Sequence, residues 1–217
     1  MSNLKPEAKL ESSESSNQEI ERRFLVNRIL WDTFRRSRVL PCALIKQGYL
    51  STNPVSRIRI IEDETNNIEV EHTIKGPKVG ITAPEFNTSY PADYALEVMK
   101  LCEHQVVKHR YTFKYFGKTW VVDEFRAENR GLLIAEIELS REDEKFRKPK
   151  FIDAEVTALG FLSNAALAKH PFQSWGATYR DATLSRVNGF DNPPPNAVYD
   201  NAMREMTEIT KQSKEGA

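Results

Sequence analysis

Charged residues of a single sign alternate with apolar residues along several segments of this chain, and this pattern constrains its fold more than any other feature. Successive side chains of a β-strand point to opposite faces, so residues two positions apart share a face. Glu19 and Glu21 therefore share one face of a predicted strand, and Arg57 and Arg59 share one face of another. A solvent-exposed face usually mixes the two signs, because like charges on neighbouring strands repel each other. Faces of one sign indicate a different environment.

Three further predicted strands also carry charged residues on one face and apolar residues on the other. The charged faces contain Glu69, Glu71 and Lys75 in the first strand, Lys108 and Arg110 in the second, and Glu136 and Glu138 in the third. Any one of these sets alone fits the solvated outer face of a sheet. Taken together, they indicate a closed barrel with a charged interior and an apolar exterior that helices cover.

A charged barrel interior needs an occupant, because unpaired buried charges are costly. Carboxylate oxygens suit hard cations such as Mg²⁺ or Mn²⁺. Arginine and lysine suit phosphate, arginine through paired hydrogen bonds and lysine as a point charge. The residue types on these faces therefore indicate a metal-bound polyphosphate as the occupant.

The alternation also predicts the order of the elements. We expect strands at 19–26, 44–50, 55–62, 68–75, 84–90, 105–115, 118–125, 132–140 and 153–157. Capping residues and prolines place helices at 28–38, 92–104 and 163–170. Strands predominate, so the predicted fold class is α+β, built on an antiparallel sheet or barrel.

Two tails flank this predicted body, which spans 19–186. Residues 1–18 are rich in serine and glutamate and have few apolar side chains, so burial cannot offset the entropy of ordering them, and we predict a disordered leader. The segment 188–196 contains Pro193, Pro194 and Pro195, and 197–211 can form a helix. We therefore predict a linker and a helical appendage over 187–217.

The overall composition limits the classes of partner. Lys and Arg number 31 and Asp and Glu number 31, so the formal net charge is zero. A general nucleic-acid binder or a polybasic membrane protein would show a basic excess, so we expect neither DNA nor a membrane as partner. No apolar run approaches the roughly 18–20 residues that cross a bilayer. Cys42 and Cys102 are isolated in the sequence, which is typical of reduced thiols in the cytoplasm.

Several motifs resemble those of one protein family. The segment 19–26 is similar to the E-x-E-x-K motif that opens the CYTH superfamily, also called the triphosphate tunnel metalloenzymes. The resemblance covers about residues 19–175, and its later motifs follow in the family's order at Arg57-Ile58-Arg59, Thr73-Ile74-Lys75-Gly76, Glu85, Lys108-His109-Arg110, Asp123, Gly131–Leu139 and Glu155-Val156-Thr157. The set is far more specific than any single member.

The resemblance implies a fold and a reaction. The fold is an eight-stranded antiparallel β-barrel that forms a tunnel, with flanking helices. Members of the bacterial and plant branch most similar to this chain often cleave inorganic tripolyphosphate, so the implied function is metal-dependent hydrolysis of tripolyphosphate or a related triphosphate. The implied cofactor is Mg²⁺ or Mn²⁺, with two ions, and the implied partner is a small-molecule triphosphate. We expect a monomer or a homodimer.

The resemblance also implies roles for individual residues. The expected metal ligands are Glu19, Glu21, Glu136 and Glu138, supported by Asp123 and Glu155. Of these, Glu21, Glu136 and Glu138 are the expected catalytic residues. The expected phosphate ligands are Arg23, Arg57, Arg59, Lys75, Lys108 and Arg110, and the further expected tunnel residues are Glu69, Glu71 and Glu85.

The sequence departs from the family pattern at a few positions and leaves other functions open. Arg23 replaces the lysine of the first motif, and Asn87 and Ser89 stand where acidic residues are usual. The alternatives are a non-catalytic module that binds triphosphates or organic phosphates, an adenylate cyclase built on the same tunnel, and an interaction scaffold. Product analysis separates a cyclase from a hydrolase, and phosphate binding without metal-dependent turnover would indicate the binding module.

Overall fold

The computed structural model describes residues 18–77, 79–176 and 180. The predicted C-terminal linker and appendage lie outside the described residues. The same holds for the predicted leader, apart from Gln18, which opens the first strand.

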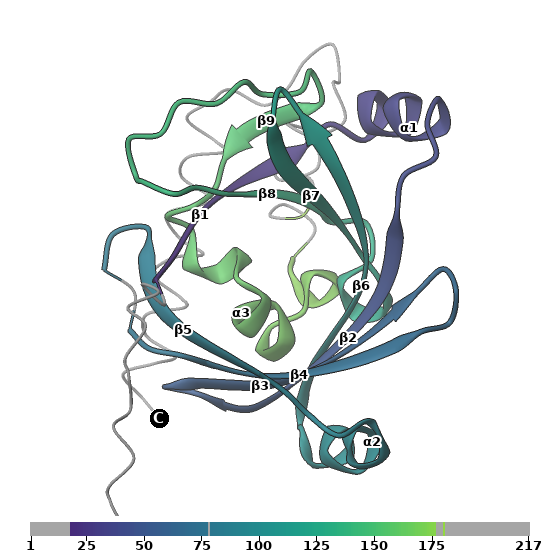
Figure 1. Cartoon of the computed structure of the whole chain (residues 1–217), viewed down its shortest axis with the longest axis vertical. Coiled ribbons are helices and arrows are strands. Elements are labelled where there is room, and N and C mark those ends of the chain that lie inside the picture. Colours follow the sequence, from purple (N-terminus) through teal and green to yellow (C-terminus); the bar gives the residue numbers. More distant parts are fainter. Residues whose placement is uncertain (1–17, 78, 177–179, 181–217) are drawn as a thin grey trace, which may run out of the picture.

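A closed antiparallel barrel forms the body of the structure (Figure 1). The sheet runs in the order β5-β4-β3-β2-β6-β7-β8-β1-β9, and a pairing between β1 and β5 closes eight of these strands into a ring. This confirms the predicted eight-stranded barrel. The strands are β1 Gln18–Val26, β2 Cys42–Thr52, β3 Val55–Asp63, β4 Ile68–Lys75, β5 Thr82–Ser89, β6 His104–Tyr115, β7 Lys118–Phe125, β8 Leu133–Glu138 and β9 Ile152–Glu155.

The first strand joins both edges of the sheet because its two halves have different neighbours. The segment 18–20 pairs with β5, whereas 21–25 pairs with β8. Beyond the barrel, Phe24 and Val26 pair with β9, which is therefore an outer addition to β1. The closure places the N-terminal glutamates of β1 beside β4 and β5.

Three α-helices were expected and are present within the described residues, as α1 Arg28–Arg36, α2 Ala92–Leu101 and α3 Asn164–Lys169. The side chain of Asn27 accepts a hydrogen bond from the Leu30 amide at 3.1 Å and so begins α1. Ser163 caps α3 in the same way, through the Ala166 amide at 3.2 Å. The predicted second helix is too long at its C-terminus, since its last predicted residue, His104, begins β6.

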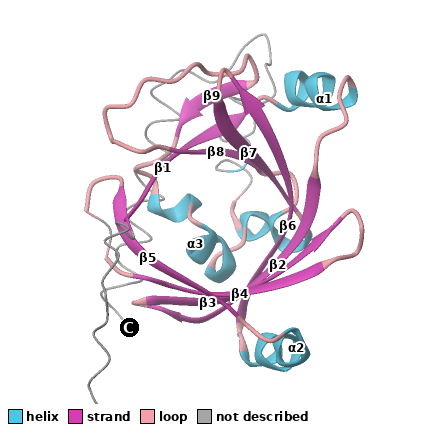
Figure 2. Cartoon of the chain, viewed as in Figure 1, coloured by secondary structure: helices cyan, strands magenta, loops and turns pink. Residues whose placement is uncertain are grey.

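Helices α1 and α2 lie outside the ring of strands, as Figure 2 shows, and each packs on apolar side chains of the barrel wall. Trp31 of α1 packs in a cluster with Phe24, Trp120 and Ile137, which lie on the outward faces of β1, β7 and β8. Helix α2 contributes Ala95 and Met99 to a second cluster, over the outward faces of β3 and β4. The apolar residues of the alternating segments therefore face outward.

The third helix lies inside the ring of strands rather than outside it (Figure 1). It belongs to a segment, residues 156–175, that we call the plug. Plug side chains, among them Phe161, Leu162 and Leu167, pack with Leu25 and Phe125 on the inward face of the wall. The expectation that helices only wrap the exterior is wrong for α3, because its apolar residues fill one end of the barrel interior.

Gly48 tests the packing of α2 on the barrel. A Cβ atom at this position would lie 2.6 Å from the Met99 sulfur and 2.7 Å from the Cys102 Cβ. Gly48→Ala should therefore lower the free energy of unfolding by about 1–3 kcal/mol, which urea denaturation measures. Gly160→Ala is the matched control, since an added Cβ there has no atom within 4 Å. Equal stability of the two variants would contradict this packing.

Candidate functional site

The end of the barrel interior that the plug leaves open holds a cavity of about 560 Å³. This volume lies within the range of small-molecule sites. Five carboxylates and five cationic side chains line it, and they come from strands around the whole barrel. The charged lining residues are Glu19, Glu21, Glu85, Glu136 and Glu138 on one hand, and Arg23, Arg57, Arg59, Lys75 and Arg110 on the other.

The strand register brings the predicted carboxylates together. Glu21 of β1 lies directly opposite Glu138 of β8, and Arg23 lies opposite Glu136. Two like charges in directly opposed positions destabilise a sheet unless other groups compensate them. Such a pair, facing a cavity, is therefore typical of a site that holds a cation.

Lys75 links the carboxylates on the other side of the barrel closure. Its Nζ forms an ion pair with Glu19 and lies 2.6 Å from Glu85 Oε2. Arg57 Nη2 approaches Glu85 Oε1 at 3.6 Å. Burial, together with the charge of Glu21, raises the pKa of Glu19 to about 7. Burial also acts to raise the pKa of Glu85, but its hydrogen bonds with Glu19 and Lys75 and the charge of Lys75 lower that pKa to about 2.

The cations of β3 form a crowded positive group. Arg59 donates from Nε to Gln47 Oε1 at 3.1 Å and from Nη1 to Glu71 Oε2 at 3.3 Å. Burial, together with the charges of Arg57 and Arg110, lowers the pKa of Arg59 to about 10. The Nε of Arg57 is buried without a hydrogen-bond partner among the described residues. An anion in the cavity would relieve this crowding and supply acceptors.

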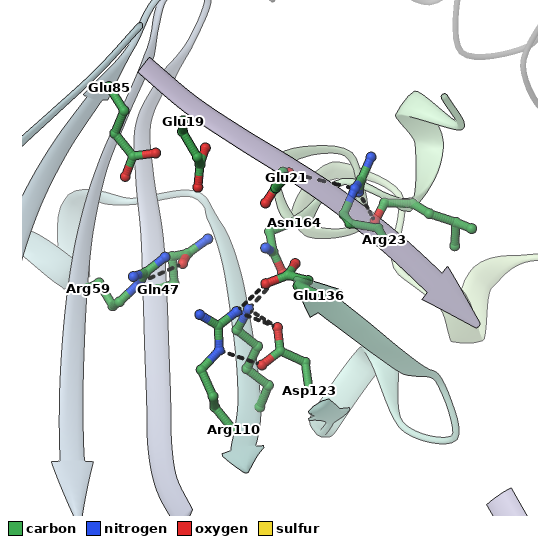
Figure 3. A network of polar contacts seen from close by, with 12 residues as sticks. Glu19, Glu21, Arg23, Gln47, Arg59, Glu85, Arg110, Asp123, Glu136 and Asn164 are labelled. Carbon is green, nitrogen blue, oxygen red and sulfur yellow. Dashed lines mark hydrogen bonds and ion pairs between the residues drawn. The ribbon is translucent and has the colours of Figure 1, made fainter. Parts of the chain in front are cut away.

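Arg110 extends this cationic group on the β6 side (Figure 3). Its guanidinium donates to both carboxylate oxygens of Asp123, each at 2.7 Å. Its Nη2 also donates to Glu136 Oε2 at 2.6 Å. The Nζ of Lys108 donates to Oδ2 of Asp123 at 2.5 Å. Lys108 and Asp123 are fully buried and do not line the cavity, in contrast to Arg110.

Arg23 lines the cavity, but its guanidinium donates hydrogen bonds to the plug (Figure 3). Its Nη1 donates to the carbonyl oxygen of Leu162 at 2.9 Å, and its Nη2 donates to that of Thr157 at 3.2 Å. The Nε lies 3.7 Å from Glu21 Oε1. The planar fork of arginine presents its donors in a fixed geometry, which suits this bridge between two carbonyl groups.

Three further predicted site residues, the expected metal ligand Glu155 and the expected tunnel residues Glu69 and Glu71, do not line the cavity. Glu155 was expected in the interior, but it pairs with the outward-facing Phe24 and forms an ion pair with Arg22 on the outer face. Glu69 is exposed at the start of β4. Glu71 contacts Arg59 but is not among the lining residues. The period of two shows which residues of a strand share a face, but the pairing register decides which of the two faces points inward. The sequence did not reveal the register of β9, so the face that carries Glu155 was assigned wrongly.

Polar residues of the plug and of β2 were missed as site residues. Asn164 and Thr157 line the cavity because the plug enters the barrel, which the sequence pattern did not predict. Gln47 is fully buried and accepts from Arg59. Its position on the same face of β2 as Ile45 and Tyr49 was the available signal.

The lining carboxylates fit a hard divalent cation by their chemistry, since glutamate oxygens are preferred ligands of Mg²⁺ and Mn²⁺. Within the described residues, however, no group of three His, Cys, Asp or Glu side chains is gathered around one point. Glu19, Glu85 and Glu136 are instead held by Lys75 and Arg110.

The helices of the described part of the chain are too short or too polar to cross a membrane.

Comparison with known proteins gives one close sequence relative. No protein-family model matches the chain. The chain is 36% identical over 161 residues to an inorganic triphosphatase of Acetivibrio thermocellus, and the aligned region covers 72% of this chain and 97% of that protein. Among solved structures, an inorganic triphosphatase is similar at 27% identity and a TM-score of 0.49, over 69% of this chain and 93% of that one. A protein from Pyrococcus horikoshii is similar at 23% identity and a TM-score of 0.46, over 58% and 80% of the two chains.

Glu19→Gln should change how stability depends on pH. Because the pKa of Glu19 is raised from 4.5 to about 7 by folding, the unfolded chain loses this proton first, and stability falls as the pH rises through this window. The substitution removes that fall. Its free energy of unfolding, relative to the parent, should therefore be roughly 1–3 kcal/mol more favourable at pH 8 than at pH 4.

Urea denaturation at both pH values, with chelator present, measures this difference. Glu69→Gln removes one carboxylate from an exposed position and serves as the control. If Glu19→Gln differed from the parent by the same amount at both pH values, the raised pKa would be contradicted.

Proposed function

The chain belongs to the CYTH superfamily, in the branch of the inorganic triphosphatases, and on that basis we propose that it hydrolyses inorganic tripolyphosphate or a related triphosphate with the help of a divalent metal ion. The observation that carries the proposal is the cavity of about 560 Å³ in which carboxylates and cations face each other. A metal-bound polyphosphate carries the complementary charges, because its phosphoryl oxygens need the cations and its metal needs the carboxylates.

The cations are proposed to bind the phosphoryl oxygens. Four of them line the cavity from strands β3, β4 and β6, namely Arg57, Arg59, Lys75 and Arg110. The unpartnered Nε of Arg57 is a hydrogen-bond donor that such a ligand would satisfy. During phosphoryl transfer these residues would stabilise the negative charge on the oxygens of the group being transferred.

The carboxylates are proposed to hold the metal. Glu19, Glu21, Glu136 and Glu138 would supply the oxygen ligands, with Glu85 beside them. Glu21, Glu136 and Glu138 are the proposed catalytic residues. When bound, Mg²⁺ or Mn²⁺ neutralises phosphate charge and lowers the pKa of a bound water. The lining carboxylates exceed the needs of one ion, which supports a pair of ions.

The substrate proposal favours an inorganic triphosphate over a nucleotide. A nucleobase is commonly bound by stacking on an aromatic face. Among the described residues that line the cavity, Tyr49 is the one aromatic residue, and it is 5% exposed, with its hydroxyl group accepting from Gln47. This arrangement does not favour the cyclase. One observation favours the binding-module alternative. Arg23, which replaces the lysine of the first motif, donates hydrogen bonds from Nη1 and Nη2 to the plug rather than to a ligand.

The proposed setting is the cytoplasm, with a small-molecule triphosphate as the partner. Cys42 and Cys102 are free thiols, which suits a reducing compartment. A monomeric or homodimeric state stays a prediction.

A phosphate-release panel tests the proposed reaction. The full chain should release orthophosphate from tripolyphosphate in the presence of Mg²⁺ or Mn²⁺, and a chelator should abolish this release. ATP, GTP, thiamine triphosphate and pyrophosphate are the comparison substrates. Release of pyrophosphate with a cyclic nucleotide would instead indicate a cyclase. Tight binding of tripolyphosphate without turnover under any of these conditions would indicate a binding module.

Glu21→Gln tests the proposed metal site. The substitution should lower metal-dependent turnover about 100-fold or more, because Glu21 is a proposed ligand of the metal. A bound metal stabilises the charge of the transition state by several kcal/mol. Stability should be unchanged or higher, since Glu21 opposes Glu138 and the substitution relieves their repulsion. Glu142→Gln, outside the cavity lining, is the matched control. Unchanged turnover in Glu21→Gln would contradict the assignment.

Arg57→Ala tests the proposed phosphate site. Because Arg57 lines the cavity and has an unsatisfied donor, the substitution should raise the KM for tripolyphosphate about 10-fold or more. The metal concentration for half-maximal turnover should change less than the KM. Arg141→Ala is the matched control, since the Arg141 side chain is exposed. An effect confined to the metal requirement would contradict a role in phosphate binding.

A further inference from the structure

A buried ion network lies directly behind the cavity wall. It joins Lys108 and Arg110 of β6 to Asp123 of β7, which the register places opposite Arg110. Lys108 and Asp123 have no exposed surface, and of the three residues only Arg110 lines the cavity. From the sequence, Asp123 was expected to bind the metal, and Lys108 and Arg110 were expected to bind phosphate.

Both carboxylate oxygens of Asp123 are already engaged. Oδ1 accepts from Arg110 Nε at 2.7 Å. Oδ2 accepts from Arg110 Nη2 at 2.7 Å and from Lys108 Nζ at 2.5 Å. This is the bidentate geometry in which a carboxylate fixes the orientation of a guanidinium. Burial opposes ionisation, but the charges of Arg110 and Lys108 hold the pKa of Asp123 well below its usual range.

The ammonium group of Lys108 is surrounded in the same way. Besides Asp123, it donates to Asn164 Oδ1 at 3.2 Å. It also lies over the ring of Phe125, 5.6 Å from its centroid. Asn164 is the first residue of α3 and lines the cavity, so Lys108 connects the barrel wall to the plug. An anion in the cavity would meet Arg110 and Asn164 before it could meet Lys108.

Arg110 is the member of the network that can act on a ligand. Asp123 occupies its Nε and one side of its Nη2, and Glu136 Oε2 accepts from the same Nη2 at 2.6 Å. No hydrogen bond within the described residues involves Nη1. Figure 3 shows the guanidinium of Arg110 beside Asp123 and Glu136, on the side that faces Gln47 and Arg59.

We propose that Asp123 and Lys108 are positioning residues, which fix Arg110 in the cavity and tie α3 to the wall, rather than ligands of the metal or of the phosphate. This inference rests on the proposed function, since it concerns how the proposed phosphate ligand Arg110 is held. Asp123 also acts on Glu136, a proposed metal ligand, but only through the guanidinium that the two carboxylates share.

The test uses the full chain, with Mn²⁺ and tripolyphosphate as separate probes and without turnover. Calorimetry measures tripolyphosphate affinity, and electron paramagnetic resonance measures Mn²⁺ affinity in the absence of phosphate. Asp123→Asn should weaken tripolyphosphate binding about 10-fold or more and change Mn²⁺ affinity less than about twofold. Glu21→Gln, at a proposed metal ligand, is the positive control for loss of Mn²⁺ affinity. Asp143→Asn, at an exposed position, is the matched control for loss of an aspartate charge.

A double-mutant cycle separates positioning from direct contact. In an Arg110→Ala background, Asp123→Asn and Lys108→Met should each change tripolyphosphate affinity less than about twofold, because the group that they position is gone. If Asp123→Asn lowered Mn²⁺ affinity as strongly as Glu21→Gln, or if either effect persisted in full without Arg110, the proposal would be overturned.

A second variant covers the case in which Asp123→Asn does not fold. The double substitution Lys108→Met with Asp123→Leu replaces the buried ion pair by apolar side chains, which proteins often tolerate well. It should retain the Mn²⁺ affinity of the parent and lose about as much tripolyphosphate affinity as Arg110→Ala. Parental tripolyphosphate affinity in this variant would overturn the proposal. Failure of the proposed hydrolysis would appear only in the phosphate-release panel, so the two inferences fail separately.

Discussion

Carboxylates and cations hold one another in place across the interior of this barrel. Neither set can be buried alone, because unpaired charges in a low-dielectric interior are costly. The closure between β1 and β5 brings Glu19 to Lys75 and Glu85, and the register of β6 with β7 and β8 brings Arg110 to Asp123 and Glu136. The outward apolar faces, the helices over them and the charged cavity all follow from this arrangement.

The sequence was sufficient to predict which face β1, β3, β6 and β8 turn inward, because a period of two fixes this once the charges show which face is the interior. It was not sufficient for β9, whose Glu155 lies on the outer face. Glu21, Arg57 and Lys75 line the cavity as expected. Alternation carries no information on depth, however. Asp123 and Lys108 point inward but lie behind Arg110 and Asn164. Likewise, no local pattern distinguishes a helix that covers a barrel from one that fills it, because both need an apolar face.

Arg23, in place of the lysine of the first motif, shows how one substitution can change the role of a residue. A lysine in this place would present a single ammonium group to the cavity. The arginine instead spans the carbonyl groups of Thr157 and Leu162, so β1 and the plug are joined at the point where the first glutamates lie. The position of the plug, and of Asn164 within it, thus depends on the same strand that carries Glu19 and Glu21.

The apolar packing of the plug against Leu25, Val106, Phe125 and Ile134 gives the barrel interior a floor. Within the described residues, the barrel interior is therefore divided along its length into a charged cavity and an apolar packed part. Thr157 and Asn164 of the plug line the cavity, so a substitution that loosens the apolar packing would also displace polar groups of the site.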